Sequence, residues 1–195
     1  MSLRFETLTG AEVERALDDL ARLRIDVFRD WPYLYDGDLG YEREYMATYQ
    51  NARDAILVGA FDGDRLVGAA TGTPMEDHAD DFAKPLEVTG LDVGSVFYCA
   101  ESVLLPAYRG QGAGRAFFEA REEHARALGR THSMFCAVIR PENHPQRPTD
   151  YVPLDDFWRR RGYAPVDGAV ATFAWRDVGD AQETDKPLQV WLKRL

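Results

Sequence analysis

The segment VLLPAYRGQGAGRAFFEAREEHARALG, residues 103–129, is the part of the sequence that indicates the fold most directly. It passes from an apolar run into a turn with glycines at positions 110, 112 and 114, and then into a run with helical periodicity. Backbone N–H groups at a helix start are free and lie at the positive end of the helix dipole, so they favour an anion. Glycines permit unusual dihedral angles and let a ligand approach the backbone. With Arg109 beside the turn and Arg115 in the first helical turn, the segment predicts a phosphate or pyrophosphate site.

Two better-known phosphate motifs fit this turn poorly. A P-loop requires a Lys followed by Ser or Thr, and no such pair follows the glycines. A dinucleotide fingerprint is matched by Gly110 and Gly112, but position 115 is Arg, and no acidic residue stands where the ribose would be bound. A nucleotide-binding oxidoreductase is therefore disfavoured.

The rest of the chain predicts one α+β domain over residues 1–195. Helices are predicted over residues 10–28, 42–50, 113–128 and 154–161, and Thr9 and Glu12 have the spacing of a capping box before the first. Strands are predicted over residues 3–7, 95–105, 132–139, 168–175 and 188–192, with a hairpin within 54–72 that turns at Asp62-Gly63. Residues 74–94 and 140–153 are predicted as loops, the first with one helical turn.

Composition excludes several classes of protein. The 195 residues are 45% hydrophobic and 12% aromatic, which is too apolar for a disordered chain. With 33 acidic and 23 basic residues the net charge is −10, which disfavours a nonspecific nucleic-acid binder or a polybasic membrane-surface protein. The two cysteines lie in apolar runs and predict neither a disulfide scaffold nor a zinc framework. No signal-peptide or membrane-spanning pattern is present in the sequence, so a cytoplasmic domain is expected.

Residues 103–129 resemble the coenzyme A-binding core of the GNAT-type N-acetyltransferases. That family's pattern is an apolar strand, a proline, an aromatic residue and then Arg/Gln-x-x-Gly-x-Gly/Ala, and Arg109, Gly112 and Gly114 fill it here. The order of the predicted elements also matches, and FWRRRGY at residues 157–163 resembles the family's short helix. The resemblance implies three α/β layers, with a mixed, mostly antiparallel sheet of six to seven strands flanked by about four helices.

The resemblance also implies acetyl-CoA as a co-substrate and no metal. The pyrophosphate would lie on the amides of the turn, and the pantetheine arm would pair like a strand with the apolar residues before it. A backbone N–H near Leu104 would stabilise negative charge on the thioester oxygen. The residues implied in cofactor binding are Val103, Leu104, Leu105, Arg109, Gly110, Gln111, Gly112, Ala113, Gly114, Arg115, Asn143 and Trp158.

Two residues are candidates for proton transfer. Glu101 interrupts an apolar run, and burial makes a carboxylate a better base, although a Glu paired with an Arg for structural reasons fits the pattern equally well. Many family members have a Tyr as the acid at the position of Trp158, and Trp has no proton to give near neutral pH. Tyr151 is the candidate acid in its place, with Tyr163 and solvent as alternatives.

The acceptor site is expected in the aromatic loop after the first predicted helix, by analogy with the family. Trp31, Tyr33 and Tyr35 lie there among aspartates, a combination suited to an amine through cation–π and ionic contacts. A loop that fills its own small core is the equally weighted alternative.

Together these features predict an N-acetyltransferase that moves an acetyl group from acetyl-CoA to a small-molecule amine or a peptide amino group, without a nucleic-acid or membrane partner. A noncatalytic acyl-CoA-binding domain of the same fold is the alternative. The closing strands could pair across a homodimer. The sequence does not identify the acceptor.

Overall fold

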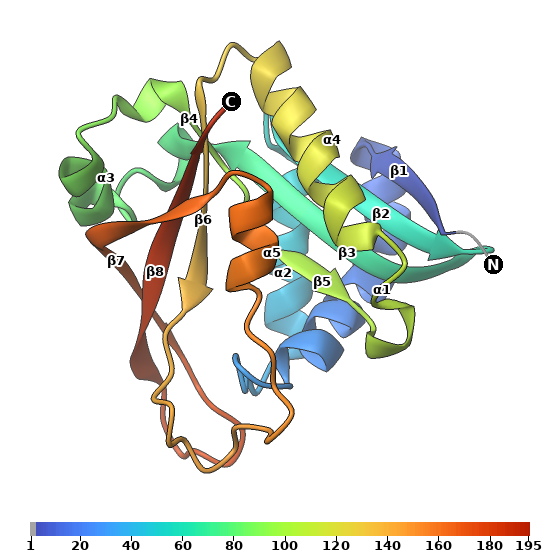
Figure 1. The fold of residues 1–195 in the computed structure, drawn as a ribbon. Coiled ribbons are helices and arrows are strands. Elements are labelled where there is room, and N and C mark those ends of the chain that lie inside the picture. The colour runs from blue at the N-terminus through green and yellow to red at the C-terminus, as the bar shows by residue number, and fades with distance from the viewer. Residues whose placement is uncertain (1–2) are drawn as a thin grey trace.

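One mixed sheet organises the molecule (Figure 1). The computed structural model describes residues 3–195, apart from the side chains of residues 50 and 51. Its strands are β1 (Arg4–Leu8), β2 (Ile56–Asp62), β3 (Arg65–Pro74), β4 (Val96–Tyr98), β5 (Ser102–Leu104), β6 (His132–Val138), β7 (Ala164–Trp175) and β8 (Thr184–Arg194). They follow the order β1-β2-β3-β4-β6-β8-β7, with β5 paired to β3. Among the strands of residues 3–195, only β4 and β6 pair in parallel.

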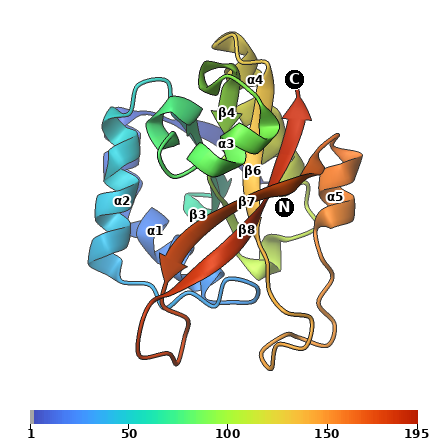
Figure 2. The same ribbon diagram turned by 90° about the vertical axis from the view of Figure 1, so that its left-hand side faces the viewer.

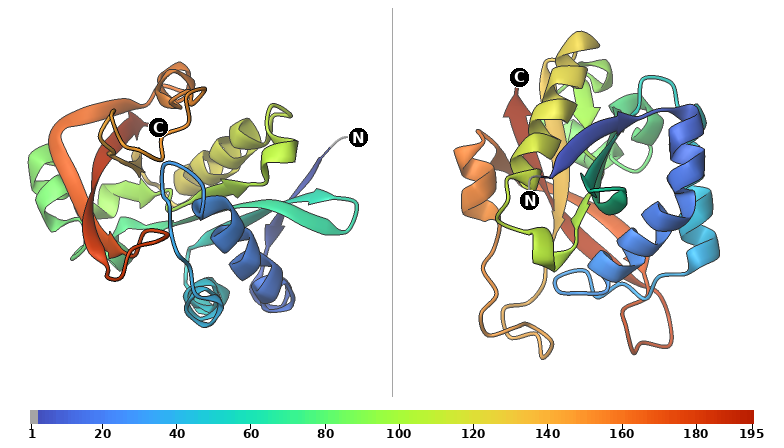
Figure 3. Two further views of the ribbon diagram at one scale, coloured as in Figure 1. Left: turned by 90° about the horizontal axis from the view of Figure 1, so that it is seen from below. Right: turned by 90° about the vertical axis from the view of Figure 1, so that its right-hand side faces the viewer.

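Helices cover both faces of the sheet, which gives the three layers that the sequence predicts. The helices are α1 (Gly10–Phe28), α2 (Leu39–Asn51), α3 (Ala83–Thr89), α4 (Ala113–Ala127) and α5 (Asp155–Arg160). Seen from below, α1 and α2 lie on one side of the sheet and α4 and α5 on the other (Figure 3). Within the described residues, no helix is long and apolar enough to cross a membrane.

The predicted start of the first helix and the predicted hairpin agree with the structure. The capping box before α1 is present, and the Thr9 N–H donates to Glu12 Oε2 at 2.9 Å. The β2–β3 hairpin turns at Gly63, whose φ of +61° suits glycine. The α2 helix begins earlier than predicted because the Asp38 carboxylate accepts a hydrogen bond from the Tyr41 N–H and caps it at Leu39.

Alternation along the strands divides the apolar side chains between the two faces. In β2, Val58 and Ala60 pack toward α4 with Phe117, whereas Leu57 packs toward α1 and α2. A third apolar cluster lies under α3 and β7 and includes Phe82. These clusters hold α4 and α1 at fixed positions on opposite faces.

The single strand predicted over residues 95–105 is wrong, because the chain breaks between β4 and β5. Against β3, Tyr98 pairs with Thr73, whereas Ser102 pairs with Ala70, so the register shifts by one residue between the two halves. One extra residue on one strand is a β-bulge, which bends the strand that carries it. The bend has a topological consequence: β4 pairs with β6 only as far as Met134, and beyond that point β6 keeps only its partner on the other edge, β8, which pairs with it along its whole length.

The structure departs from the prediction in three further places. Residues 74–94 contain the helix α3 and two 3₁₀ turns rather than one helical turn, and α3 packs against β7 (Figure 2). The strand β8 begins before the apolar residues that predicted it, because its ladder with β7 continues into polar sequence at Thr184 and Lys186. The strand β7 also begins early, because Ala164 and Pro165 pair with Leu192 and Trp191. With the break in β4–β5, the sheet has eight strands rather than six or seven. β7 lies at its edge, and pairing of β7 across a homodimer stays a prediction.

Candidate active site

The glycine turn leaves an open helix start at α4. Gly110 and Gly112 have φ angles of +78° and +87°, which L side chains rarely adopt. A Cβ at either position would meet no atom within 4 Å, so the space beside the turn is open. Gly112 caps the helix without a side chain, and the first helical bond runs from Ala116 N to Gly112 O at 3.1 Å. The amides at the start of α4 are therefore available to an anionic ligand.

The other residues of the turn have different roles in the structure. Arg109 and Gln111 are exposed beside the open amides. Arg115 pairs with Glu119 of the same helix, with 2.7 Å between Nε and Oε1. Gly114 serves packing, because a Cβ there would lie 3.2 Å from Cζ of Phe157 on α5. Asn143 is exposed on the loop after β6.

One edge of β5 carries no strand partner among the described residues. The opposite edge of β5 is hydrogen-bonded to β3. At its two ends, Thr71 N donates to Glu101 O at 3.0 Å, and Leu105 N donates to Val67 O at 2.9 Å. Backbone groups alternate sides along a strand, so the peptide groups of Ser102 and Leu104 face the free edge. Val103 lies between them, with its side chain buried against α1. This edge lies directly before the glycine turn and can take an extended ligand as a strand would.

Trp158 belongs to an aromatic cluster on the core. Its ring lies 5.0 Å from that of Phe135 on β6 and 5.0 Å from that of Trp191 on β8. Phe135 directly follows Met134, the last residue of β6 that pairs with β4, so α5 covers β6 where the two strands separate. Trp158 fills space at this position and provides no acidic proton.

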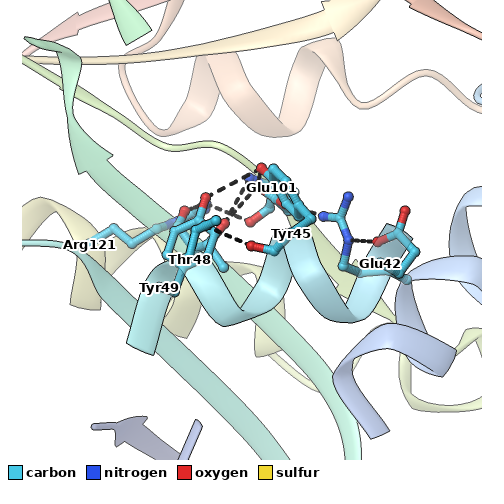
Figure 4. A network of polar contacts seen from close by, with 8 residues as sticks. Glu42, Tyr45, Thr48, Tyr49, Glu101 and Arg121 are labelled. Atoms are coloured by element: carbon cyan, nitrogen blue, oxygen red, sulfur yellow. Dashed lines mark hydrogen bonds and ion pairs between the residues drawn. The ribbon is translucent and has the colours of Figure 1, made fainter. Parts of the chain in front are cut away.

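Glu101 lies in the break between β4 and β5, at the centre of a polar network (Figure 4). Its carboxylate forms an ion pair with Arg24 of α1 and accepts hydrogen bonds from Thr71 Oγ1 at 2.7 Å and Tyr45 Oη at 3.4 Å. The side chain is 9% exposed, and that of Arg24 is 11% exposed. The arginine partner supports the structural interpretation of Glu101, and the position beside the free edge of β5 supports the catalytic one.

Arg24 links two buried carboxylates. It pairs with Glu42 of α2 as well as with Glu101, and its guanidinium lies 4.5 Å from the Tyr45 ring centroid. Burial opposes the charge of Arg24, but the carboxylate of Glu101, with Tyr45 and Glu42, holds its pKa above the usual arginine value. Arg24 therefore keeps its positive charge. Of the two carboxylates, that of Glu42 is fully buried, and its Oε1 atom has no hydrogen-bond partner.

Arg121 stabilises the bulge from the α4 side. Its side chain is 1% exposed, and Nη1 donates to Thr71 O at 3.1 Å and to Glu101 O at 3.0 Å. Nη2 donates to Ser102 Oγ at 2.9 Å. The guanidinium thus binds the carbonyl of Glu101 in the break and that of Thr71 on the neighbouring strand β3, and it connects the helix of the glycine turn to the residue predicted as base.

The two tyrosines considered as acids occupy different environments. Tyr151 is half-buried in the loop before α5, and burial together with Asp155 raises its pKa, so it carries a proton at neutral pH. Its ring lies 5.9 Å from that of Trp31. Tyr163 is buried, and its hydroxyl is bonded to Ser133 at 2.7 Å and to Glu122 at 3.1 Å. Tyr163 is therefore a packing residue, and Tyr151 remains the tyrosine candidate.

The aromatic loop does not present its rings as one cluster. Trp31 faces the loop after β6, 5.1 Å from His144. Tyr33 packs inward on Phe28 at 4.6 Å, and burial raises its pKa, with the nearby Glu101 carboxylate acting in the same direction. Tyr35 forms a β-bridge to Asp177. The loop therefore fills part of its own core and also brings Trp31 to Tyr151. The first observation supports the core-filling interpretation, and the second supports the acceptor-site interpretation.

A cavity of about 500 Å³ lies beside this loop and away from the glycine turn. Its lining residues are Ile139, Arg140, Pro141, His144, Asp177, Thr184, Asp185, Lys186 and Pro187. Among the described residues, no group of three or more His, Cys, Asp or Glu could hold a metal ion.

Comparison with known proteins places this site in a family. The model of the acetyltransferase (GNAT) family matches residues 19–149, more than half of the chain. The chain therefore belongs to the GNAT family of acetyltransferases, as residues 103–129 predict. No curated protein is significantly similar to the chain in sequence.

Solved structures share the fold at low sequence identity. PaiA N-acetyltransferase from Thermoplasma acidophilum, in complex with coenzyme A, is 13% identical, with a TM-score of 0.54 and complete coverage of both chains. YncA from Salmonella typhimurium, with its cofactor acetyl-CoA, is 12% identical, with a TM-score of 0.59 over 100% of this chain and 95% of that one. An acetyltransferase from Streptococcus agalactiae is 16% identical, with a TM-score of 0.59 over 100% and 99%. These similarities establish the fold.

The sequence prediction missed the partners of Glu101. Arg24 and Arg121 each interrupt the apolar stripe of a helix: Arg24 follows Leu20 by one turn, and Arg121 follows Phe117 in the same way. A charged residue on a buried helical stripe is a recognisable signal, because its burial requires a partner. Glu42 and Thr71 carry no comparable signal, since their burial follows from tertiary packing alone.

Proposed function

We propose that this chain transfers the acetyl group of acetyl-CoA to a primary amine of a small molecule or peptide. The observation that carries the proposal is the free edge of β5 beside the open start of α4. The edge offers backbone groups at Ser102 and Leu104 to an extended arm, and the turn offers amides to a pyrophosphate. No other part of the described chain combines these two features in sequence.

The residues present fit acetyl-CoA at this position. Open space beside Gly110 and Gly112 accommodates a ligand at the backbone, and Arg109 adds a positive charge there. The N–H of Leu104 faces the free edge, where it can stabilise negative charge on the thioester oxygen. Acetyl-CoA supplies the activated acetyl group, and the protein supplies position and proton transfer.

Amine attack on the thioester carbon forms the C–N bond and breaks the C–S bond. The amine nitrogen must lose a proton, and the sulfur of coenzyme A must gain one. Glu101 is the proposed proton acceptor, because it lies in the bulge that precedes the free edge. Tyr151 is the proposed donor, because it keeps its proton at neutral pH and no tyrosine stands at position 158.

Two observations favour the noncatalytic alternative. Glu101 is neutralised by Arg24, and Trp158 stands where an acid would be expected. A panel of primary amines incubated with acetyl-CoA separates the two functions. Formation of an acetylated amine, with an equal amount of free coenzyme A, supports the enzyme, and acetyl-CoA binding without any product supports the binding domain.

Replacing Glu101 with Gln is expected to lower kcat by about 100-fold, the usual scale of a general base, and to leave the acetyl-CoA dissociation constant within about twofold. Steady-state kinetics and calorimetry give the two values. Glu42→Gln is the matched control, since Glu42 pairs with the same Arg24 but lies outside the break. Equal losses of kcat in both variants would show that Glu101 acts only through Arg24, and the proposed base would be wrong.

A further inference from the structure

Arg140 holds the aromatic loop by its backbone. It lies two residues after the end of β6, and its side chain is 8% exposed. Nε donates to Pro32 O at 2.8 Å, and Nη2 donates to Tyr33 O at 2.5 Å. Two carbonyl groups of the loop thus bind one buried guanidinium, and no side chain of the loop takes part.

The same guanidinium is fixed from the other side by Asp177. Nη1 lies 2.6 Å from Asp177 Oδ2, and Nη2 lies 2.9 Å from Oδ1, which is a bidentate arrangement of high geometric specificity. Although burial opposes ionisation, the hydrogen bond and charge of Arg140, with Lys186, hold the pKa of Asp177 below its usual value. Lys186 Nζ lies 3.5 Å from Oδ1 and donates to Trp175 O at 3.0 Å. Two buried cations therefore share one carboxylate.

Further bonds join the loop to the last residue of β7 and to residues that follow it. Trp175 Nε1 donates to Tyr33 O at 3.0 Å, Val178 N donates to Leu34 O at 2.7 Å, and Asp36 N donates to Arg176 O at 2.9 Å. Tyr33 O accordingly accepts from both Arg140 and Trp175. The loop, the end of β6 and the β7–β8 connection are tied together at Arg140.

Two aromatic side chains of the loop depend on this backbone. The Tyr33 ring packs on Phe28 of α1, with 4.6 Å between the ring centroids. Trp31 contacts His144 and Tyr151 in the loop after β6. Displacement of the Pro32–Tyr33 backbone would move both rings, while the glycine turn and the free edge of β5 lie on other elements.

We propose that Arg140, oriented by Asp177, is a positioning residue for the acceptor: it fixes the loop that places Trp31 beside Tyr151, the proposed proton donor. This inference rests on the proposed function. It predicts that loss of Arg140 raises the KM for the amine and leaves the dissociation constant of acetyl-CoA unchanged. A residue needed only for folding would not affect one substrate alone.

Arg140→Gln is the suitable variant because it leaves Asp177 paired with Lys186, so no carboxylate is left without a cation. We expect the KM for each primary amine that the wild type acetylates to rise by about tenfold, the scale of lost hydrogen bonds to a charged group. The acetyl-CoA dissociation constant, measured by calorimetry, should stay within about twofold. Arg140→Lys keeps the positive charge and can donate to one of the Arg140 partners. Its KM for the amine should therefore lie between those of the wild type and Arg140→Gln.

Glu122→Gln is the matched control. Glu122 forms a buried ion pair with Lys193, at 2.6 Å, on the α4 side of the sheet, and its loss should change neither the amine KM nor the acetyl-CoA affinity. An unchanged amine KM in Arg140→Gln, or an equal weakening of both substrates, would overturn the proposal.

Amide hydrogen exchange keeps this test separate from the proposed function. If the wild type acetylates no amine, the proposed function fails, but the exchange rates of Leu34, Tyr35 and Asp36 can still be compared. Faster exchange in Arg140→Gln than in Glu122→Gln supports the role of Arg140 in holding the loop. Equal exchange in the two variants would contradict it.

Discussion

Replacing Gly112 with Glu is expected to weaken acetyl-CoA binding by about 100-fold or more, equivalent to about 2.8 kcal/mol. The new carboxylate would stand at the start of α4, where the structure offers open space and free amides. Two like charges about 4 Å apart repel by roughly 1 kcal/mol in water and by about 4 kcal/mol near a protein surface, and a pyrophosphate carries more than one charge. Calorimetric titration of acetyl-CoA measures the effect.

Gly90→Glu is the control for this variant. Gly90 also has a positive φ, +65°, and a Cβ there would meet no atom within 4 Å. The control therefore introduces the same charge and comparable backbone strain at the end of α3, remote from the turn. Acetyl-CoA affinity should be unchanged in Gly90→Glu, and similar affinities in the two variants would exclude the turn as the pyrophosphate site.

Arg24→Met is expected to lower the free energy of unfolding by about 3–5 kcal/mol, the usual result of breaking a buried ion pair by removing one partner. The carboxylates of Glu42 and Glu101 are 0% and 9% exposed and would remain buried without their shared cation. Unfolding in urea, followed by circular dichroism, gives the difference.

Two further variants show whether this loss comes from the buried carboxylates. Arg24→Met combined with Glu42→Gln removes one of the two and should recover part of the stability. Arg22→Met, on the same helix but with an exposed side chain and partners at 3.9–4.0 Å, should cost less than about 1 kcal/mol. A loss of that small size in Arg24→Met would contradict the account of the network.

The parts of the molecule that follow from local sequence were predictable. The capping box, the Asp62-Gly63 hairpin and the glycine turn before α4 each depend on residues within a few positions of one another. The family was recognisable for the same reason, since its most specific motif lies in residues 103–115.

The break at Glu101 was not predictable in this way. An apolar run with one Glu favours a continuous strand, because the groups that stabilise the bulge come from distant elements: Arg24 from α1, Thr71 from β3 and Arg121 from α4. The contact of Arg140 with the aromatic loop was unpredictable for the same reason. Arg140 binds backbone carbonyl groups of the loop, and any residues at positions 32 and 33 would provide these groups. In both places the functional geometry depends on long-range polar contacts.

Exchange of the Leu104 amide proton with solvent, followed by NMR with and without acetyl-CoA, tests the central claim most directly. In the free protein this N–H faces the unpaired edge of β5 and should exchange rapidly, whereas the Leu105 N–H is bonded to Val67 O at 2.9 Å and should be slow. Saturation with acetyl-CoA is expected to slow exchange at Leu104 and at the first amides of α4, with Leu105 unchanged. Unaltered exchange at Leu104 under saturating acetyl-CoA would contradict the assignment of the free edge as the cofactor site.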